Sequence, residues 1–322
     1  MKEIQYTQYD IEAARIIDDF LPDKIFDVHM HISHLKSIFN GRSFDDYYRE
    51  MKIFHKERTV HCNGIIFPCV ELKKPGELKK ANLFLANELD RYPNNKGETI
   101  VFPSDTVDDI MERLTHPNIC GLKCYWVYSN REDGCYSTIN EFLPEAAWVV
   151  ANEKKMVITL HMVKDEALAH PDNLNYIINM SKKYPDAVII LAHAARAFAS
   201  WTVFDTVDKL VNYENVWFDF SCICEVPAML YIIKKIGITR CMWGTDYAVC
   251  NSIGKPISLA DNFYWITEED LKNFDAVMNF RWGHVITEAF MAIRQTCILA
   301  DITDSQKEDF FYNNANILFN RR

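Results

Sequence analysis

The chain has 322 residues, 49% of them hydrophobic and 25% charged, and it carries a net charge of −10 at pH 7. This is the composition of a globular protein with a large core, and an acidic chain without a Lys/Arg cluster excludes a typical nucleic-acid binder. No apolar run approaches the roughly 18 residues of a membrane-spanning helix. The ten scattered cysteines and an N-terminus without a signal-peptide core lead us to expect a cytoplasmic protein with free thiols.

Strand and helix patterns alternate along the chain after an N-terminal helix. Residues 1–23 have the spacing of an amphipathic helix, which Pro22 ends. Apolar runs predict eight strands, at 24–32, 63–70, 98–103, 119–127, 156–162, 187–193, 216–221 and 240–247. Helical patterns lie between and after them, at 44–54, 78–91, 107–114, 139–153, 174–184, 203–213, 227–236 and 286–299.

This alternation predicts an α/β fold, and eight strand–helix units are the count of a (β/α)8 TIM barrel. An open doubly wound sheet would also alternate, but it usually has a glycine-rich turn after its first strand, where this chain has two histidines. We therefore predict a single domain over residues 1–322, with an N-terminal helix and a C-terminal helical extension. The barrel would span about residues 24–250, and residues 251–322 would supply a loop over its mouth and the closing helices.

The first predicted strand, K-I-F-D-V-H-M-H-I, ends in two histidines one residue apart. Side chains alternate along a strand, so His29 and His31 share one face, and Asp27 is expected on the same face. The apolar residues at 26, 28 and 30 would face the other way, so that both faces are covered. Two imidazoles at the end of a buried strand resemble half of a metal site, and two histidines bonded only to backbone are the alternative.

Four further polar residues lie on or at the ends of later strands. His161 ends the fifth, His193 the sixth and Asp246 the eighth, while Lys123 lies on the fourth. Each alone has an ordinary structural explanation. Barrel active sites form where the strands end, however, and burying so many polar groups together is unfavourable unless a shared cation offsets it. Their joint placement therefore predicts a metal site.

The motifs around these residues resemble a known family. The phrases F-D-V-H-M-H, G-L-K, I-T-L-H, I-I-L-A-H-A-A-R, V-W-F-D-F-S and M-W-G-T-D-Y are similar to those of the amidohydrolase superfamily, in its amidohydrolase-related branch. That branch includes aminocarboxymuconate-semialdehyde decarboxylase and related metal-dependent hydrolases. The resemblance extends from about Ile25 to Phe319, where N-A-N-I-L-F is similar to the usual last helix.

The resemblance implies a role for each polar residue. The ligands of one divalent metal would be His29, His31, His161 and Asp246. Zinc is favoured, with manganese or iron as alternatives. His193 would be an acid/base group or a second metal ligand, and Lys123 a structural or substrate-facing cation. Arg196 would bind a substrate carboxylate or, equally, form a salt bridge on a helix.

Two departures from the branch leave the substrate open. Glycines often follow the sixth-strand histidine in that branch, whereas Ala194, Ala195 and Arg196 follow it here. The segment 247–282, after the eighth strand, matches no pattern of the branch that we identify. The resemblance therefore implies the metal centre more directly than it implies the reaction.

The expected reaction is hydrolysis of a C–N or C–O bond, in an amide, lactone or ester of a small carboxylated molecule, through a metal-activated water. Asp246 would take the proton of that water, and His193 would stabilise the oxyanion or pass the proton to the leaving group. The alternative is metal-dependent, non-oxidative decarboxylation of a small aromatic or enolic acid, with His193 or Asp246 protonating carbon. A non-catalytic binding protein is a third hypothesis, against which the complete ligand set argues.

The expected partners are the small-molecule substrate and a second copy of the chain, because members of this branch are commonly homodimers. Neither a nucleic acid nor a membrane is expected as a partner. Sedimentation as a monomer would contradict the expected dimer.

Overall fold

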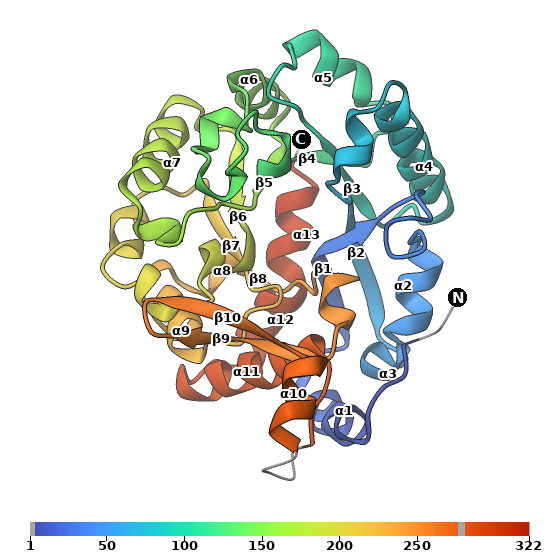
Figure 1. Ribbon diagram of the computed structural model, residues 1–322, viewed down its shortest axis with the longest axis vertical. Helices are drawn as coiled ribbons and strands as arrows, with labels where there is room; N and C mark the ends of the chain where they lie inside the picture. The colour runs from blue at the N-terminus through green and yellow to red at the C-terminus, as the bar shows by residue number, and fades with distance from the viewer. Residues whose placement is uncertain (1–3, 276–280, 322) are drawn as a thin grey trace.

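The computed structural model describes residues 4–275 and 281–321. Eight parallel strands form one sheet in the order β1 to β8, and helices surround it, which confirms the (β/α)8 TIM barrel (Figure 1). The strands are β1 (Lys24–Ile32), β2 (Thr59–Ile66), β3 (Lys96–Ile100), β4 (Ile119–Cys124), β5 (Val157–Leu160), β6 (Val188–Leu191), β7 (Val216–Asp219) and β8 (Cys241–Met242).

Thirteen α-helices are described, besides shorter 3₁₀ segments, and several have the predicted boundaries to within a few residues. They are α1 (Gln8–Phe20), α2 (Phe44–Glu50), α3 (Lys52–His55), α4 (Glu77–Arg91), α5 (Val107–Arg113), α6 (Glu145–Lys154), α7 (Pro171–Lys183), α8 (Ala192–Arg196), α9 (Val226–Ile236), α10 (Glu268–Asp275), α11 (Val285–Leu299), α12 (Asp304–Glu308) and α13 (Asn314–Phe319). Capping boxes start α1, α2 and α5, in which a Ser or Thr side chain and an Asp three residues later satisfy the first backbone N–H groups. Within the described ranges, every helix is too short or too polar to cross a membrane.

The barrel closes where β1 meets the chain around β8. The backbone N–H of Val28 donates to the carbonyl of Trp243 at 3.1 Å. Further along, Asp246 N donates to His29 O at 2.6 Å, and His31 N donates to Tyr247 O at 2.5 Å. This seam therefore runs past β8 itself, and it sets Asp246 beside the two histidines of β1.

The alternation of β1 breaks in its middle. The register with β2 shifts within residues 27–30. Phe26 and Val28 belong to a small inner cluster with strand residues and α13, whereas Asp27 bonds to the hydroxyl of Tyr47 on α2 at 2.8 Å. The prediction that Asp27 shares a face with the two histidines was therefore wrong, as was the placement of 26 and 28 on the outer face.

Asp27 itself explains how the shift is tolerated. Its Oδ1 accepts the backbone N–H groups of His29 at 3.0 Å and Thr245 at 2.9 Å, and its Oδ2 accepts the hydroxyl of Thr245 at 2.6 Å. The carboxylate thus satisfies backbone donors that the irregular ladder leaves unpaired. It also ties β1 to the segment after β8.

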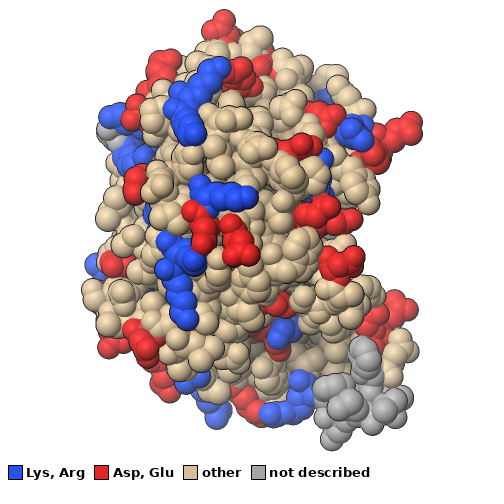
Figure 2. Space-filling view, turned by 90° about the vertical axis from the view of Figure 1, so that its left-hand side faces the viewer, with Lys and Arg blue, Asp and Glu red and all other residues tan. Residues whose placement is uncertain are grey.

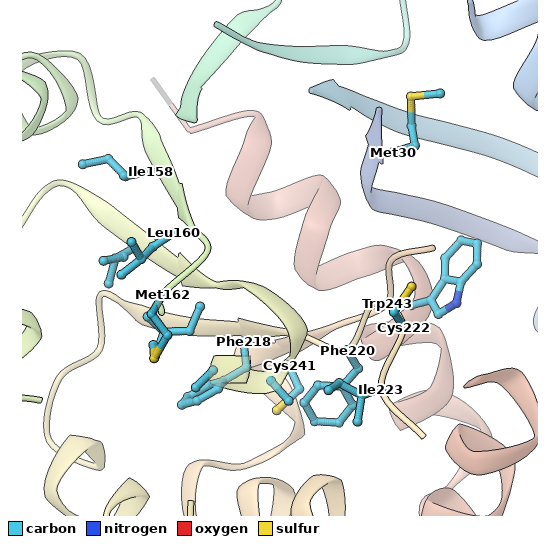
Figure 3. Close-up of a cluster of buried hydrophobic side chains, with 14 of the residues drawn as sticks. Met30, Ile158, Leu160, Met162, Phe218, Phe220, Cys222, Ile223, Cys241 and Trp243 are labelled. Carbon is cyan, nitrogen blue, oxygen red and sulfur yellow. The ribbon is translucent and has the colours of Figure 1, made fainter. Parts of the chain in front are cut away.

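Two apolar clusters fill the barrel and surround it. Outward-facing strand residues such as Leu160 and Phe218 are fully buried in the larger cluster (Figure 3). The smaller cluster joins Phe26 and the first residues of several strands to Leu318 and Phe319 of α13, which crosses the centre of the ring of strands in Figure 1. The N-terminal end of the barrel is therefore packed with apolar side chains, and the polar residues lie at the opposite end.

Two predicted segments differ from the structure. The helix expected at 203–213 is replaced by 3₁₀ turns at Ser200–Thr202 and Val207–Leu210. Asp205 adopts φ 60° there, and the Thr206 hydroxyl bonds to earlier carbonyls, so the helical ladder cannot continue. After β8, where a loop and helices were expected, β9 (Gly254–Leu259) and β10 (Asn262–Thr267) form an antiparallel hairpin.

The surface carries charges of both signs. Figure 2 shows one face, on which Lys and Arg side chains lie close to Asp and Glu rather than in a continuous basic surface. Arg58 and Lys56, for example, both bond to Asp18. Pairs on the exposed surface contribute little to stability.

Asp10 of α1 is fully buried and links α1 to α11. Its carboxylate accepts the backbone N–H of His284 at 2.9 Å, the His284 ring at 2.7 Å and the Thr287 hydroxyl at 2.6 Å. It also caps α1 through Thr7. Burial opposes ionisation, but the hydrogen bonds from His284 and Thr287 lower the pKa of Asp10 from 3.8 to about 2.

Replacing Asp10 with alanine is expected to lower the free energy of unfolding by about 3 kcal/mol, because several buried donors lose their acceptor. The folded-state pKa is depressed, so this stabilisation is fully present above pH 3.8 and is lost as pH falls toward 2. Urea unfolding should show the gap between wild type and Asp10→Ala shrinking from about pH 5 to about pH 3. Glu12→Ala, on the exposed side of α1, serves as the control and should change little; a gap independent of pH would contradict the role of Asp10.

Candidate metal centre

Side chains from five strands or the turns after them meet at the C-terminal end of the barrel. β1 supplies His29 and His31, and β4 supplies Lys123. The other three residues lie just after the ends of their strands. They are His161 after β5, His193 after β6 and Asp246 after β8. The structure therefore brings together all the residues that the sequence placed at the strand ends.

The two histidines of β1 converge on one oxygen of Asp246. Nε2 of His31 lies 3.0 Å from Oδ1 of Asp246, and Nε2 of His29 lies 3.6 Å from the same oxygen. Burial and the nearby Lys123 charge lower the pKa of His29 to about 4, so this imidazole is neutral at pH 7. Burial opposes ionisation of Asp246, but the surrounding His193, His31 and His29 hold the pKa of its carboxyl below the usual range.

This arrangement fits a divalent metal. Nδ1 of His29 lies 3.0 Å from Oδ2 of Asp219 and donates its proton there, so the lone pair on Nε2 points toward the oxygen of Asp246. Two lone pairs in a buried site repel unless a cation lies between them. Ligand atoms around a tetrahedral zinc lie about 3.3 Å apart, given Zn–N distances of about 2.0–2.1 Å, and the observed separations bracket that value.

Asp219, the last residue of β7, orients the site from behind. Besides His29, it accepts the backbone N–H of His193 and that of Ser221, each at 3.1 Å, and it also bonds to the Ser221 hydroxyl. Among the described residues, His29, His193 and Asp219 form a second group with donor atoms within 4.8 Å of one another. Because the oxygens of Asp219 already accept these bonds, we interpret this group as a scaffold for the first group, His29, His31 and Asp246.

His193 stands in a left-handed turn. Residues 193 to 196 all have positive φ, between 51° and 64°, and the turn is closed by a hydrogen bond from Ala197 N to His193 O of 2.9 Å. Nδ1 of His193 lies 3.0 Å from the carbonyl oxygen of Ser221, to which it can only donate. Nε2 is therefore the ring nitrogen left to exchange a proton.

This left-handed turn is where the sequence has Ala194 and Ala195 in place of the glycines that often follow the sixth-strand histidine in the amidohydrolase-related branch. Glycine adopts positive φ readily, whereas an L-residue in this region is disfavoured by about 1–2 kcal/mol. Ala194 and Ala195, both buried, occupy it with φ 51° and 64°. Two hydrogen bonds keep the strained turn in place. The backbone N–H of His193 donates to Asp219, and the N–H of Ala197 donates to the carbonyl of His193.

Ala195→Gly should therefore destabilise the protein by about 1 kcal/mol less than Ala192→Gly does. Both changes remove a buried methyl group and add freedom to the unfolded chain, but only Ala195 has positive φ. Thermal or urea unfolding of the two variants isolates the strain as their difference. Equal destabilisation would show that the left-handed turn is not strained.

Lys123 lies on β4, and His161 follows the neighbouring strand β5. The ring of His161 is 5.0 Å from that of His193 and 5.1 Å from that of Tyr125, and its role as a ligand stays a prediction. Nζ of Lys123 lies 3.5 Å from Nε2 of His29. Burial lowers the pKa of Lys123, while the nearby Glu98 carboxylate counteracts that effect.

A cavity of about 300 Å³ opens above these residues. Its walls include six aromatic residues, Phe67, Tyr125, Trp126, Phe198, Phe263 and Trp265. Arg196 also lines it, with its guanidinium 5.0 Å from the centre of the Phe263 ring and its Nη1 bonded to the carbonyl of Lys164 at 2.7 Å. Lys123 and Arg196 therefore both lie where a substrate would bind, and their contact with substrate stays a prediction.

Several residues of the site were absent from the sequence-based prediction, among them Asp219, Phe263 and Trp265. Asp219 lay in the quoted phrase V-W-F-D-F-S, and its position at a strand end was the same signal that identified the histidines. Phe263 and Trp265 come from the unexpected hairpin. Their signal was two short runs rich in apolar and aromatic residues, P-I-S-L and F-Y-W-I-T, on either side of the turn A-D-N, a pattern typical of two paired strands.

Comparison with known proteins gives one family match. A family model described as Amidohydrolase matches residues 79–321, which include His161, His193 and Asp246; the two histidines of β1 precede it. A search of curated proteins finds no match.

Solved structures share the fold at low identity. An amidohydrolase from Burkholderia multivorans with bound zinc is 10% identical, with a TM-score of 0.59 over 92% of this chain and 98% of that one. The 5-carboxyvanillate decarboxylase of Sphingomonas paucimobilis is 13% identical, with a TM-score of 0.56 over 94% of this chain and 100% of that one. A Pseudomonas putida protein assigned as a 2-pyrone-4,6-dicarboxylic acid hydrolase is 13% identical, with a TM-score of 0.56 over 93% and 98%. At such identities these likenesses establish the fold.

Proposed function

Because the chain belongs to the amidohydrolase family, we propose that it is a metal-dependent hydrolase of a C–N or C–O bond in a small carboxylated molecule. The observation that carries this proposal is the convergence of His29 Nε2 and His31 Nε2 on Oδ1 of Asp246 at the floor of an apolar cavity. His161 and zinc complete the proposed centre, with one ion per chain. A divalent metal bound there would supply a Lewis acid and would lower the pKa of a coordinated water from about 15.7 toward 7.

The chain's own residues then divide the remaining tasks. Asp246, which is ionised, can accept a proton at its carboxylate. His193 can stabilise a developing oxyanion or deliver a proton to the leaving group from Nε2, because its Nδ1 is engaged by Ser221. Arg196 and Lys123 would bind the substrate carboxylate, and the aromatic walls would limit the access of bulk water.

Non-oxidative decarboxylation is the second candidate. The aromatic walls and the two cations of the cavity suit a flat carboxylic acid as well as a lactone or amide. The structural relatives include a decarboxylase as well as a protein assigned as a hydrolase. In this reaction the same metal ligands would hold the acid, and His193 or Asp246 would protonate the carbon that loses CO₂.

Isotope labelling separates the two reactions. The zinc-loaded protein is incubated with small lactones, amides, esters and aromatic acids in water labelled with ¹⁸O or deuterium. We expect one solvent oxygen in the product of a lactone, ester or amide; release of CO₂ with solvent deuterium on carbon would instead establish decarboxylation. Metal analysis should give about one ion per chain. Two ions would contradict the single-metal centre and the proposed role of Lys123.

A further inference from the structure

The β9–β10 hairpin forms one wall of the catalytic cavity. Side chains alternate along β10, so Phe263 and Trp265 line the cavity, while Tyr264 between them is 48% exposed. Phe263 and Trp265 pack on Phe198, with ring centres 4.9 Å and 5.8 Å apart. Phe198 in turn stacks on His193 at 5.6 Å, so the wall is continuous with the proposed acid/base residue.

The hairpin is fastened to the barrel at its base and at its tip. Near the base, Gly254 N donates to Gly283 O at 3.1 Å. Toward the tip, the indole N–H of Trp201 donates to Asp261 O at 3.2 Å, and Ser258 N donates to a carboxylate oxygen of Glu225 at 3.0 Å. These bonds make the hairpin a fixed wall.

The close pairing of the two strands depends on Gly254. It has φ 133°, and a Cβ at this position would lie 1.9 Å from the carbonyl oxygen of Ile266 on β10. Only glycine fits at position 254 of β9. Its close contact with Ile266 therefore helps to fix the position of Trp265, the neighbour of Ile266 on β10.

Trp265 also borders a second space. This is a cleft of about 890 Å³, lined by polar residues such as Arg42 and Glu268 and by apolar ones such as Phe39 and Ile253. Trp265 and Val249 line both the cavity and the cleft. The indole therefore borders both the small apolar cavity above the proposed metal and a larger outer cleft of mixed lining.

We infer that Trp265 is a specificity-determining residue that limits the substrate to a single small ring or a group of that size. The inference rests on the proposed function, since it takes the cavity as the place where substrate binds. A cavity of about 300 Å³ is at the small end of ligand sites, and its walls are set by packed rings. A longer molecule can extend into the outer cleft only when the indole is removed, so Trp265 selects by exclusion.

Binding of two carboxylates of different length tests this inference. Isothermal titration of the full-length, zinc-loaded protein is carried out with benzoate and with biphenyl-4-carboxylate, whose second ring extends the first along its axis. Wild type should bind benzoate at least about 10-fold more tightly than the longer acid. Trp265→Ala should shift that ratio by at least about 10-fold toward the longer acid, and Trp265→Phe should give an intermediate shift. Tyr264→Ala, the matched control on the exposed side of the same strand, should behave as wild type.

Several outcomes would overturn the inference. It would be overturned if wild type bound benzoate and biphenyl-4-carboxylate with equal affinity, or bound neither acid. It would also be overturned if Trp265→Ala left the ratio of the two affinities unchanged. If Trp265→Ala fails to fold, Trp265→Phe alone must still shift the ratio. Because binding is measured without turnover, a shifted ratio in a protein that converts no labelled substrate would contradict the proposed reaction and leave the role of Trp265 supported.

Discussion

Asp246→Asn is expected to remove the metal and to lower kcat/KM by at least about 10³-fold, or about 4 kcal/mol of transition-state stabilisation. Oδ1 of Asp246 is the atom on which both imidazoles of β1 converge, so the asparagine takes the negative charge away from the centre of the proposed ligand set. Asparagine has the same shape, which limits the change in packing. Metal content after dialysis and kinetics on the substrate identified by labelling measure the two effects.

Asp205→Asn is a matched control for this substitution. Asp205 also has positive φ, 60° against 58° for Asp246, but it lies exposed and away from the cavity. It should keep wild-type metal content and activity. An Asp246→Asn protein that retained one tightly bound ion would contradict the ligand assignment, and an unchanged biological effect of this variant would favour a non-catalytic binding protein.

Asp219→Asn is expected to weaken metal binding by about 10- to 100-fold, although Asp219 is not proposed as a ligand. Its carboxylate fixes which nitrogen of His29 carries the proton and holds the backbone of His193. The asparagine amide presents a donor where His29 needs an acceptor, so Nε2 of His29 would no longer be presented to the metal in the right tautomer. Competition with a chromophoric chelator measures the affinity of the folded variant.

Asp10→Asn distinguishes positioning from general destabilisation. It alters another buried carboxylate that is bonded to a histidine, but one between α1 and α11 and away from the cavity. It should lower the free energy of unfolding and leave the metal affinity unchanged. If both variants weakened metal binding equally, the effect of Asp219 would be one of stability alone.

Much of the fold followed from the sequence because its signals are local. Eight apolar runs separated by helical patterns specify the barrel, and the geometry of parallel strands brings polar residues at their ends to one edge. His29, His193 and Asp246, which are distant in sequence, were therefore expected together before any contact was known. The structure brings these three residues together at one end of the barrel. Their function as metal ligands or acid/base groups is tested by the experiments above.

The parts that could not be predicted depend on backbone geometry without a sequence signature. The shifted register of β1 turns Asp27 outward, although the period-two pattern places it with His29. The positive φ of Ala194 and Ala195 could not be predicted from the sequence, because alanine favours the right-handed helix. The aromatic, strand-forming run around Trp265 was visible in the sequence, but its position after the eighth strand gave no indication that the hairpin would form a wall of the cavity.

The closing seam of the barrel has a consequence for how the protein is made. Asp27 and Thr245, bonded across this seam, are 218 residues apart in the chain, and the proposed ligands His29 and Asp246 lie directly beside them. A chain emerging from the ribosome carries the two histidines early but lacks the carboxylate until most of its length has been synthesised. The proposed metal centre can therefore form only after Asp246 has been synthesised, and metal content would report on whether β1 and the segment after β8 have come together.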